Sequence, residues 1–266
     1  MDEVLRLAPA GLREALAERG AEVEEAWREG PRAYLRAGPV FARYSLAELD
    51  APVLEHEASV RALVGEEGPL RAPPVLARGA GWLLERRVVP GDEPVEVVLA
   101  AAAELAELEL PSPPVSPRRR LSLGPLRRRL RLLGRPRLAA ELARARRLLA
   151  ATRLPEVTTH GDFHPGNVLR AGGAAWVIDW ELAGHGPAGY DLMRYWATLA
   201  DPVEREGLYA GALELTGDEL QLTRLRYAIA VITAADKLSH PEALNRDEEG
   251  AAAILAMLPE LRAAAE

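Results

Sequence analysis

The most constraining feature of the chain is a polar loop that leads into a short β-hairpin. The loop covers residues 160–167 and reads HGDFHPGN, and the hairpin is formed by NVLR, a Gly172-Gly173 turn and AAWVID. A diglycine between two β-forming runs favours a tight hairpin turn. Because its strands are antiparallel, we expect Asn167, which begins the first strand, to lie beside Asp179, which ends the second.

Oxygen-bearing side chains gather at this open end of the hairpin. Asp162 lies in the entering loop, five residues before Asn167. Carboxylate and carboxamide oxygens are hard ligands that suit Mg²⁺, an ion that usually keeps several waters and takes other ligands from phosphate. Two metal ligands, Asn167 and Asp179, together with a further carboxylate that can accept a hydroxyl proton, form a working set for phosphoryl transfer.

These segments resemble the catalytic loop and metal-binding segment of the aminoglycoside phosphotransferase and choline kinase family, relatives of protein kinases. HGDFHPGN matches the family pattern H-G-D-x-H-x-x-N, DWE stands where protein kinases have D-F-G, and GYDLMRY resembles the next family motif. By this resemblance Asp162 is the catalytic base, and His160 shapes the loop around it. Asn167 and Asp179 bind Mg²⁺, and Asp191 braces the backbone of the loop.

The resemblance also implies a fold, and patterns along the chain agree with it. RAYLRAG and PVFARYS alternate around a Gly38-Pro39 turn and predict an antiparallel hairpin, which is followed by a helix capped at Asp50 and by a strand in GWLLERRVV. Helical spacing predicts helices over 95–110, 136–154, 186–200, 218–239 and 247–265.

We therefore expect an α+β, bilobal protein-kinase-like fold. A small antiparallel-sheet lobe over residues 1–89 lies on the nucleotide side, and a larger, mainly helical lobe over residues 90–266 holds the catalytic loop and the substrate site. Pro90, Gly91 and Pro94 connect the two lobes.

The small lobe supplies candidates for nucleotide binding. Kinases of this kind hold nucleotide phosphates with a basic residue on the third strand, which pairs with a Glu on a helix. No Lys occurs in this part of the chain, so Arg43 takes the strand position and Glu57 the helix position, with Glu55 in a poorer register. Arg87 and Val88 are candidates for backbone contacts to the base.

Two features of the small lobe depart from the kinase pattern. The segment that should cover the phosphates has Gly30 but no glycine-rich turn, and Phe41 is bulky where the pattern has a small side chain against adenine. Together with the replacement of Lys by Arg, these departures favour an alternative, a catalytically silent, kinase-shaped binding protein.

Charge is distributed unevenly along the chain. The net charge is −7, but residues 118–153 contain 13 Arg and a single acidic residue, Glu141, between two acidic segments. This Arg-rich belt suits either intramolecular contacts to acidic neighbours or docking of an anionic partner. A nucleic-acid or membrane-surface protein is thus a third alternative, although few aromatic side chains are available in the belt to stack on bases.

Other classes are disfavoured by composition. The chain has no Cys, which removes disulfides, thiolate catalysis and zinc-thiolate sites. No apolar run approaches the length of about 20 residues that a membrane span needs, and the acidic start is unlike a signal peptide. We expect a cytoplasmic protein without a membrane partner.

The expected function is therefore that of a kinase that moves the terminal phosphate of ATP or GTP to a hydroxyl group of a small molecule with the help of Mg²⁺. His164, Trp180 and Glu181 are candidates for the substrate side. An amine-bearing, cationic acceptor would suit acidic residues expected nearby, but solvated helix faces explain them equally; they are Glu181, Asp201, Glu204, Glu206, Asp218 and Asp236.

Overall fold

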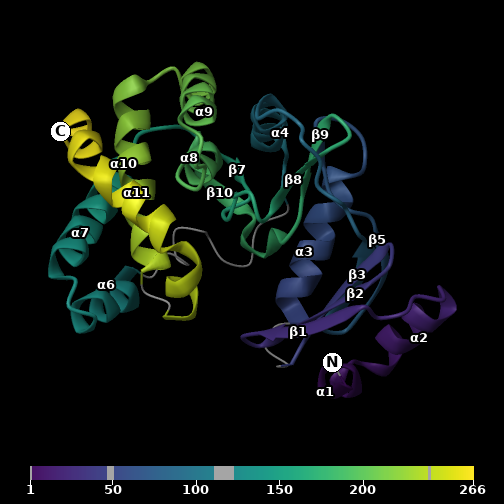
Figure 1. Ribbon diagram of the computed structural model, residues 1–266. Helices are drawn as coiled ribbons and strands as arrows, with labels where there is room; N and C mark the ends of the chain where they lie inside the picture. The colour runs from purple at the N-terminus through teal and green to yellow at the C-terminus, as the bar shows by residue number, and fades with distance from the viewer. Residues whose placement is uncertain (1, 47–50, 111–122, 239–240) are drawn as a thin grey trace.

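A five-stranded antiparallel sheet forms the N-terminal part of the protein (Figure 1). The structure is a computed structural model that describes residues 2–46, 51–110, 123–238 and 241–266. The strands follow the order β1-β2-β3-β6-β5, with bounds β1 Glu25–Glu29, β2 Arg32–Ala37, β3 Val40–Ser45, β5 Val75–Gly79 and β6 Trp82–Arg86. The predicted hairpin is confirmed as β2 and β3, with Gly38 at φ +56° in the turn, a conformation that costs glycine little.

Burial alternates along β2 and defines two different faces of the sheet. Ala33, Leu35 and Ala37 pack in a buried cluster with Leu12 and other apolar residues of the N-terminal helices, which are α1 (Asp2–Leu7) and α2 (Ala10–Glu18). Because side chains alternate along a strand, Arg32 and its alternate neighbours point to the opposite face. The chain thus covers one face with apolar helices, while the opposite, polar face carries arginines together with the aromatic rings of Trp27, Tyr34 and Phe41.

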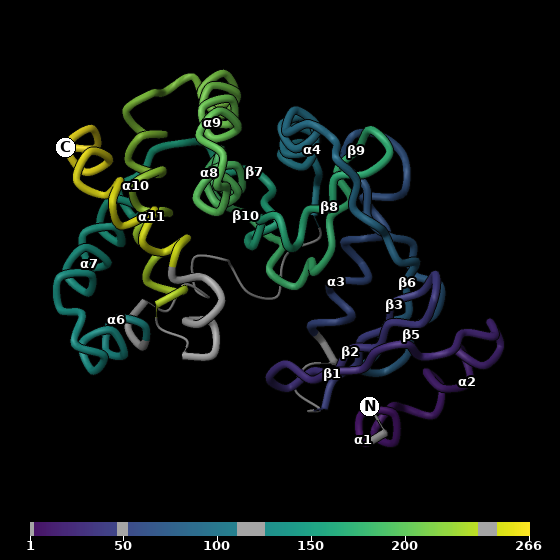
Figure 2. Tube along the Cα trace, in the orientation of Figure 1, coloured from purple at the N-terminus to yellow at the C-terminus, as the bar shows by residue number. Residues whose placement is uncertain are grey.

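Helix α3 (Ala51–Val64) lies between the polar face of the sheet and the catalytic hairpin (Figure 2). It contacts β6 on one side and the short 3₁₀ helix η2 (Trp180–Leu182) on the other. The hairpin itself is confirmed as β8 (Val168–Ala171) and β9 (Ala174–Val177). Strand β9 also pairs in parallel with β4 (Leu70–Arg71), so a segment from the first 89 residues joins the sheet that contains the β8–β9 hairpin.

The C-terminal part is mainly helical and packs around α10 (Glu219–Lys237), which is buried along most of its length. The helices predicted from spacing are confirmed as α4 (Glu96–Glu107), α7 (Pro136–Ala151), α8 (Tyr190–Trp196), α10 and α11 (Pro241–Ala265). Helices α6 (Leu123–Leu132) and α9 (Pro202–Thr216) were not expected, nor was the pair of strands β7 (Glu156–Thr159) and β10 (Gly184–Pro187).

The mixed sheet and helical architecture confirms the predicted α+β, protein-kinase-like class. The boundary at residue 89 stays a prediction. The predicted cap at Asp50 and the Pro-rich segment at residues 111–120 lie outside the described residues. No helix within the described ranges combines the length and the hydropathy needed to cross a bilayer.

Candidate active site

The loop at residues 160–167 is held by one buried carboxylate. Asp191, in the first turn of α8, accepts hydrogen bonds from the backbone N–H groups of His160 (2.7 Å) and Gly161 (3.0 Å). Burial raises the pKa of Asp191 to about 7, against the effect of these two hydrogen bonds, which favour the charged form. The two N–H groups explain why an oxygen-bearing side chain is needed at this position.

His160 fastens the loop to the strand that carries Asp179. The Nε2 atom of His160 lies 2.9 Å from the carbonyl oxygen of Ile178, and its Nδ1 atom accepts a hydrogen bond from the N–H group of Asp162 (3.3 Å). This pattern requires the neutral tautomer with its proton on Nε2. Burial lowers the pKa of His160, which also favours the neutral ring. His160 is fully buried, so its contacts are those of a support for the loop.

Trp180 does not reach the surface on the substrate side. Its side chain is fully buried, its indole N–H donates to the carbonyl oxygen of Val177 (2.8 Å), and its ring meets the His160 ring edge-on with 4.9 Å between centroids. Trp180 thus packs beneath the loop in this structure, and a contact between it and the substrate stays a prediction. The large aromatic ring is more stable packed beneath the loop than exposed to water.

Three side chains surround the carboxylate of Asp162. The Nη2 atom of Arg194 donates to Oδ1 (2.9 Å), while Nδ2 of Asn167 and Nε2 of His164 lie 3.3 Å and 3.5 Å from Oδ2. Burial works to raise the pKa of Asp162, but the hydrogen bond from His164 and the positive charge of Arg194 outweigh it and hold that pKa well below its usual range. Asp162 is therefore a fixed carboxylate anion.

Arg194 was not identified from the sequence. It lies on α8 one turn after Asp191, and its Nη1 atom donates to the hydroxyl of Thr233 on α10 (3.0 Å). Residues three apart on a helix share one face, so Asp191 and Arg194 both point toward the loop. The i,i+3 spacing of an acid and a base within GYDLMRY was the available signal.

Asn167 directly precedes β8 and Asp179 follows β9 by two residues, so both lie at the open end of the hairpin. The N–H group of Ile178 donates to the carbonyl oxygen of Asn167 (2.9 Å), and the pairing continues with Val168 opposite Val177. The amide nitrogen of Asn167 donates a hydrogen bond to the carbonyl oxygen of Asp162 (3.0 Å). The amide oxygen of Asn167 therefore remains available as a ligand for a cation. One amide oxygen and one carboxylate fit Mg²⁺, which accepts water and phosphate for its other positions.

A buried ion-pair network connects this hairpin to the sheet. Arg43 on β3 forms an ion pair with Glu57 on α3, and its Nη1 atom donates to Oδ1 of Asp179 (3.0 Å). Arg61 lies 3.2 Å from the same Glu57 carboxylate and also pairs with Glu85 on β6. Burial lowers the pKa of Arg43, against the opposing charges around it. The structure thus brings Arg43 and Glu57 together and directs Arg43 to Asp179.

A second arginine approaches the hairpin from the sheet. Arg32, the first residue of β2, forms an ion pair with Glu181, and its Nη1 atom lies 3.8 Å from Oδ1 of Asp179. Among the described residues other than glycine, Asp179 alone has a positive φ, 62°. That left-handed conformation suits a short polar side chain. Glu181 lies at the junction between the sheet and the hairpin, although it was expected on the substrate side.

The candidates for base contacts have different surroundings. The N–H group of Arg87 donates to the carbonyl oxygen of Pro39 (2.8 Å), an extension of the β3–β6 pairing. This bond uses the backbone N–H group of Arg87 within the sheet, and backbone contacts of Arg87 and Val88 to a nucleotide base stay a prediction. Val88 follows as a half-buried residue after the end of β6. On the polar face of the sheet, Trp27 stacks on Tyr34 with 5.3 Å between ring centroids.

Several acidic residues once considered for a cationic acceptor have intramolecular roles. Asp201 and Asp218 accept hydrogen bonds from backbone N–H groups at the starts of α9 and α10, and Glu204 pairs with Arg170 (2.8 Å). In the Arg-rich belt, Arg144 pairs with the side chain of Glu266. Each of these four charged side chains therefore contacts another group of the same chain.

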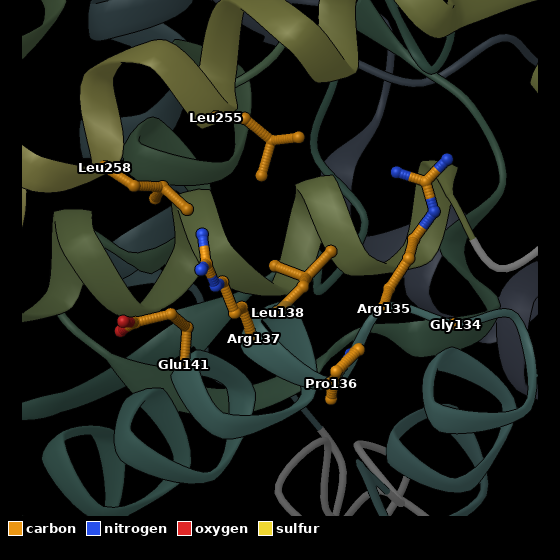
Figure 3. Close-up of a pocket in the computed structure, with 8 residues that line it drawn as sticks. All are labelled: Gly134, Arg135, Pro136, Arg137, Leu138, Glu141, Leu255 and Leu258. Carbon is orange, nitrogen blue, oxygen red and sulfur yellow. The ribbon is translucent and has the colours of Figure 1, made fainter.

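A cavity of about 490 Å³ opens in the helical part, between the start of α7 and α11 (Figure 3). Apolar and charged side chains line it, and none of them belongs to the catalytic loop, the hairpin or the sheet; they are Gly134, Arg135, Pro136, Arg137, Leu138, Glu141, Leu255 and Leu258. The cavity is therefore separate from the candidate active site.

An antiparallel sheet joined through an Arg–Glu pair to a loop-and-hairpin segment on a helical lobe defines a protein of the protein-kinase-like class. The model of the phosphotransferase enzyme family, APH, matches residues 4–226, which is most of the chain. The chain belongs to this family of phosphotransferases.

Solved structures show the same fold. A choline/ethanolamine kinase family protein from Mesorhizobium loti is 17% identical, with a TM-score of 0.62 over 100% of this chain and 94% of that one. The streptomycin–ATP ternary complex of APH(2″)-IIa is 12% identical, with a TM-score of 0.62 over 96% and 98% of the two chains. The aminoglycoside phosphotransferase APH(3″)-Id from Streptomyces rimosus is 22% identical, with a TM-score of 0.57 over 84% and 96%. No curated protein sequence matches the chain.

Proposed function

We propose that this family member transfers the terminal phosphoryl group of ATP or GTP to a hydroxyl group of a small molecule. The observation that carries the proposal is the Asp162 carboxylate, which three side chains hold ionised beside the hairpin with the two oxygen donors. Phosphoryl transfer depends mainly on positioning and on electrostatic stabilisation, and a fixed anion next to a cation site meets both needs.

In this proposal Asp162 orients the acceptor hydroxyl and takes its proton as the new bond from the hydroxyl oxygen to phosphorus forms, while the bond from that phosphorus to the departing nucleoside diphosphate breaks. The depressed pKa of Asp162 keeps it ionised and ready to accept a hydrogen bond, while His160 and Asp191 fix the loop through backbone contacts. A low pKa makes a weak base, so the proton moves late, when the hydroxyl oxygen has already lost electron density to phosphorus.

Asn167 and Asp179 would hold Mg²⁺, which when bound neutralises charge on the nucleotide phosphates. The fit rests on their hard oxygen atoms and on the hairpin that joins them. Arg43 would bind the phosphates, with Glu57 fixing its direction. Residues 1–89 thereby form the nucleotide side, and residues 90–266 the catalytic and acceptor side.

The relatives guide the choice of acceptor. Related structures are complexes with streptomycin, gentamicin and kanamycin, so a small hydroxylated molecule is the proposed partner. Of the acidic residues considered for a cationic acceptor, Glu204 is paired with Arg170, and Asp201 and Asp218 cap helices.

Nucleotide binding is tested first by thermal unfolding with ATP and GTP, each with and without Mg²⁺. A ligand that binds the native state raises the midpoint temperature of unfolding. At a ligand concentration of a hundred times its Kd, the free energy of unfolding increases by about 2.7 kcal/mol. We expect stabilisation that requires Mg²⁺. A midpoint that neither nucleotide changes would favour the catalytically silent alternative.

A further inference from the structure

Arg32 is placed at the junction between the sheet and the hairpin by the local structure of the chain. Gly30, at φ +58°, turns the chain from β1 to β2, and Arg32 pairs across the ladder with Glu29 and Ser45. The alternation in β2 buries Ala33 and directs Arg32 to the polar face, where its side chain is 12% exposed. The position follows from strand geometry and a turn.

Two guanidinium groups converge there on one carboxylate oxygen. The Nη1 atoms of Arg43 and Arg32 lie 3.0 Å and 3.8 Å from Oδ1 of Asp179. Asp179 is also the carboxylate expected to bind Mg²⁺. A divalent ion on that carboxylate would neutralise the charge that both arginines share, which leaves each with one acidic partner, Glu181 for Arg32 and Glu57 for Arg43, and with capacity for a further anion.

The local charge balance points to the nature of that anion. Among the residues that the structure describes, the connected ion pairs contain three positive and four negative side chains: Arg32, Arg43 and Arg61 with Glu57, Glu85, Asp179 and Glu181. Their sum is −1, and a bound divalent cation would change it to +1. A site with that positive charge and with two planar guanidinium groups directed at the Oδ1 atom of Asp179 suits the oxygen atoms of a phosphate group.

We propose that Arg32 is a phosphate-binding residue that grips the terminal phosphates of a nucleoside triphosphate together with Arg43. This inference rests on the proposed function and assigns to a side chain the task that a glycine-rich turn performs through backbone N–H groups. On nucleotide binding, Arg32 exchanges its contact to Asp179 for contacts to phosphate.

The test is titration calorimetry of ATP, ADP and AMP, each with Mg²⁺, on the unchanged protein and on Arg32→Gln. Loss of a charge-assisted hydrogen bond pair corresponds to about a tenfold to hundredfold weaker binding. We expect that loss for ATP, a smaller one for ADP and none for AMP. Arg36→Gln is the matched control, because Arg36 is on the same strand and face but pairs with Glu25 at the outer edge (2.6 Å); its ATP affinity should stay unchanged.

Each other outcome decides against a specific claim. Unchanged ATP affinity in Arg32→Gln, or an equal loss for AMP, overturns the inference and makes Arg32 a structural tie between sheet and hairpin. Absence of ATP binding in the unchanged protein removes the proposed function and this inference with it. If Arg32→Gln does not fold, Arg32→Lys is measured instead. Lys keeps the positive charge but lacks the planar guanidinium group, so ATP affinity should still fall. Full ATP affinity in Arg32→Lys would overturn the proposed bidentate binding of phosphate.

Discussion

At the residue scale, the charge state of Asp162 depends on Arg194. Burial alone would raise the pKa of the carboxyl, and the hydrogen bond from His164 and the guanidinium of Arg194 reverse that effect. A carboxyl whose pKa is depressed in the folded state contributes stability above its unfolded pKa of about 3.9, and the contribution is lost as the pH falls below that value. Asp162 therefore stays ionised across the neutral range.

The Arg194→Gln variant tests this dependence. Removal of the cation leaves burial opposed by His164 alone, so the pKa of Asp162 should rise toward or above about 4. We expect the rate of phosphoryl transfer, or of slow ATP hydrolysis, to fall more steeply as the pH drops below about 5 in the variant than in the unchanged protein, in which Asp191 already titrates near 7. Arg194→Lys, which retains the charge, is the control. Identical acid limbs in all three proteins would contradict the role assigned to Arg194.

A second comparison separates the two carboxylates of the site. Asp162→Asn keeps the size of the side chain but removes its charge, so turnover should fall about a hundredfold to ten-thousandfold while Mg-ATP still binds. Asp179→Asn should lose metal-dependent binding as well. Calorimetry with ATP and Mg²⁺ measures affinity, and a phosphate-release assay measures turnover. Full turnover in Asp162→Asn would reject its place in the reaction.

At the element scale, the catalytic loop is shaped by a glycine that no other residue can replace without strain. Gly161 has φ +86°, and a Cβ atom there would lie 2.6 Å from the carbonyl oxygen of Leu182, the last residue of η2. Gly173 in the hairpin turn also has a positive φ, 72°, but a Cβ atom there would meet nothing within 4 Å. Both positions require a left-handed backbone conformation, but only at Gly161 would a Cβ atom also clash with a neighbouring backbone atom.

Alanine substitutions at these glycines should therefore differ in cost. Gly173→Ala should lower the free energy of unfolding by about 1–2 kcal/mol, the cost of a left-handed conformation for a residue with a Cβ atom. Gly161→Ala carries the same cost plus a backbone contact that must open, which adds about 1–3 kcal/mol. Urea denaturation measures both. Equal losses would mean that the loop moves away from Leu182 at little cost.

The sequence predicted those elements whose signal is local. The Gly172-Gly173 hairpin, the β2–β3 hairpin and the spacing of α10 were all readable from neighbouring residues. The β7–β10 and β4–β9 pairs join segments far apart in the chain, and no local pattern specifies such partners. Arg32 was overlooked because the expected phosphate contact was a backbone one, whereas the structure offers a side chain.

At the scale of the whole molecule, one ion-pair network connects the two parts of the protein. It runs from Glu85 on β6 through Arg61 and Glu57 on α3 to Arg43 on β3, and then to Asp179 after the catalytic hairpin. Glu57 is fully buried and lies between two guanidinium groups. Its charge therefore keeps Arg43 and Arg61 from facing each other as unpaired like charges.

Replacement of Glu57 by Gln should consequently destabilise the entire protein. Loss of one partner from a buried ion pair costs about 3–5 kcal/mol, since the remaining charges stay buried. Glu66→Gln is the control, because Glu66 pairs with Arg86 at 3.1 Å on the surface, where both side chains are about half exposed and such a pair contributes about 0.2–1 kcal/mol. Urea unfolding followed by circular dichroism and by tryptophan fluorescence gives both free energies.

The two probes also test whether the network unites the lobes. Trp27 and Trp82 lie in the sheet, while Trp180 and Trp196 lie in the helical part. Coincident transitions are expected in the unchanged protein, because Arg43 links the sheet to Asp179. In Glu57→Gln, Arg43 loses the partner that directs it, so the sheet should unfold first and the transitions should separate. Suppose that Glu57→Gln loses no more free energy of unfolding than Glu66→Gln and that its two transitions remain coincident. The network would then contribute nothing to the cooperative unfolding of the two lobes.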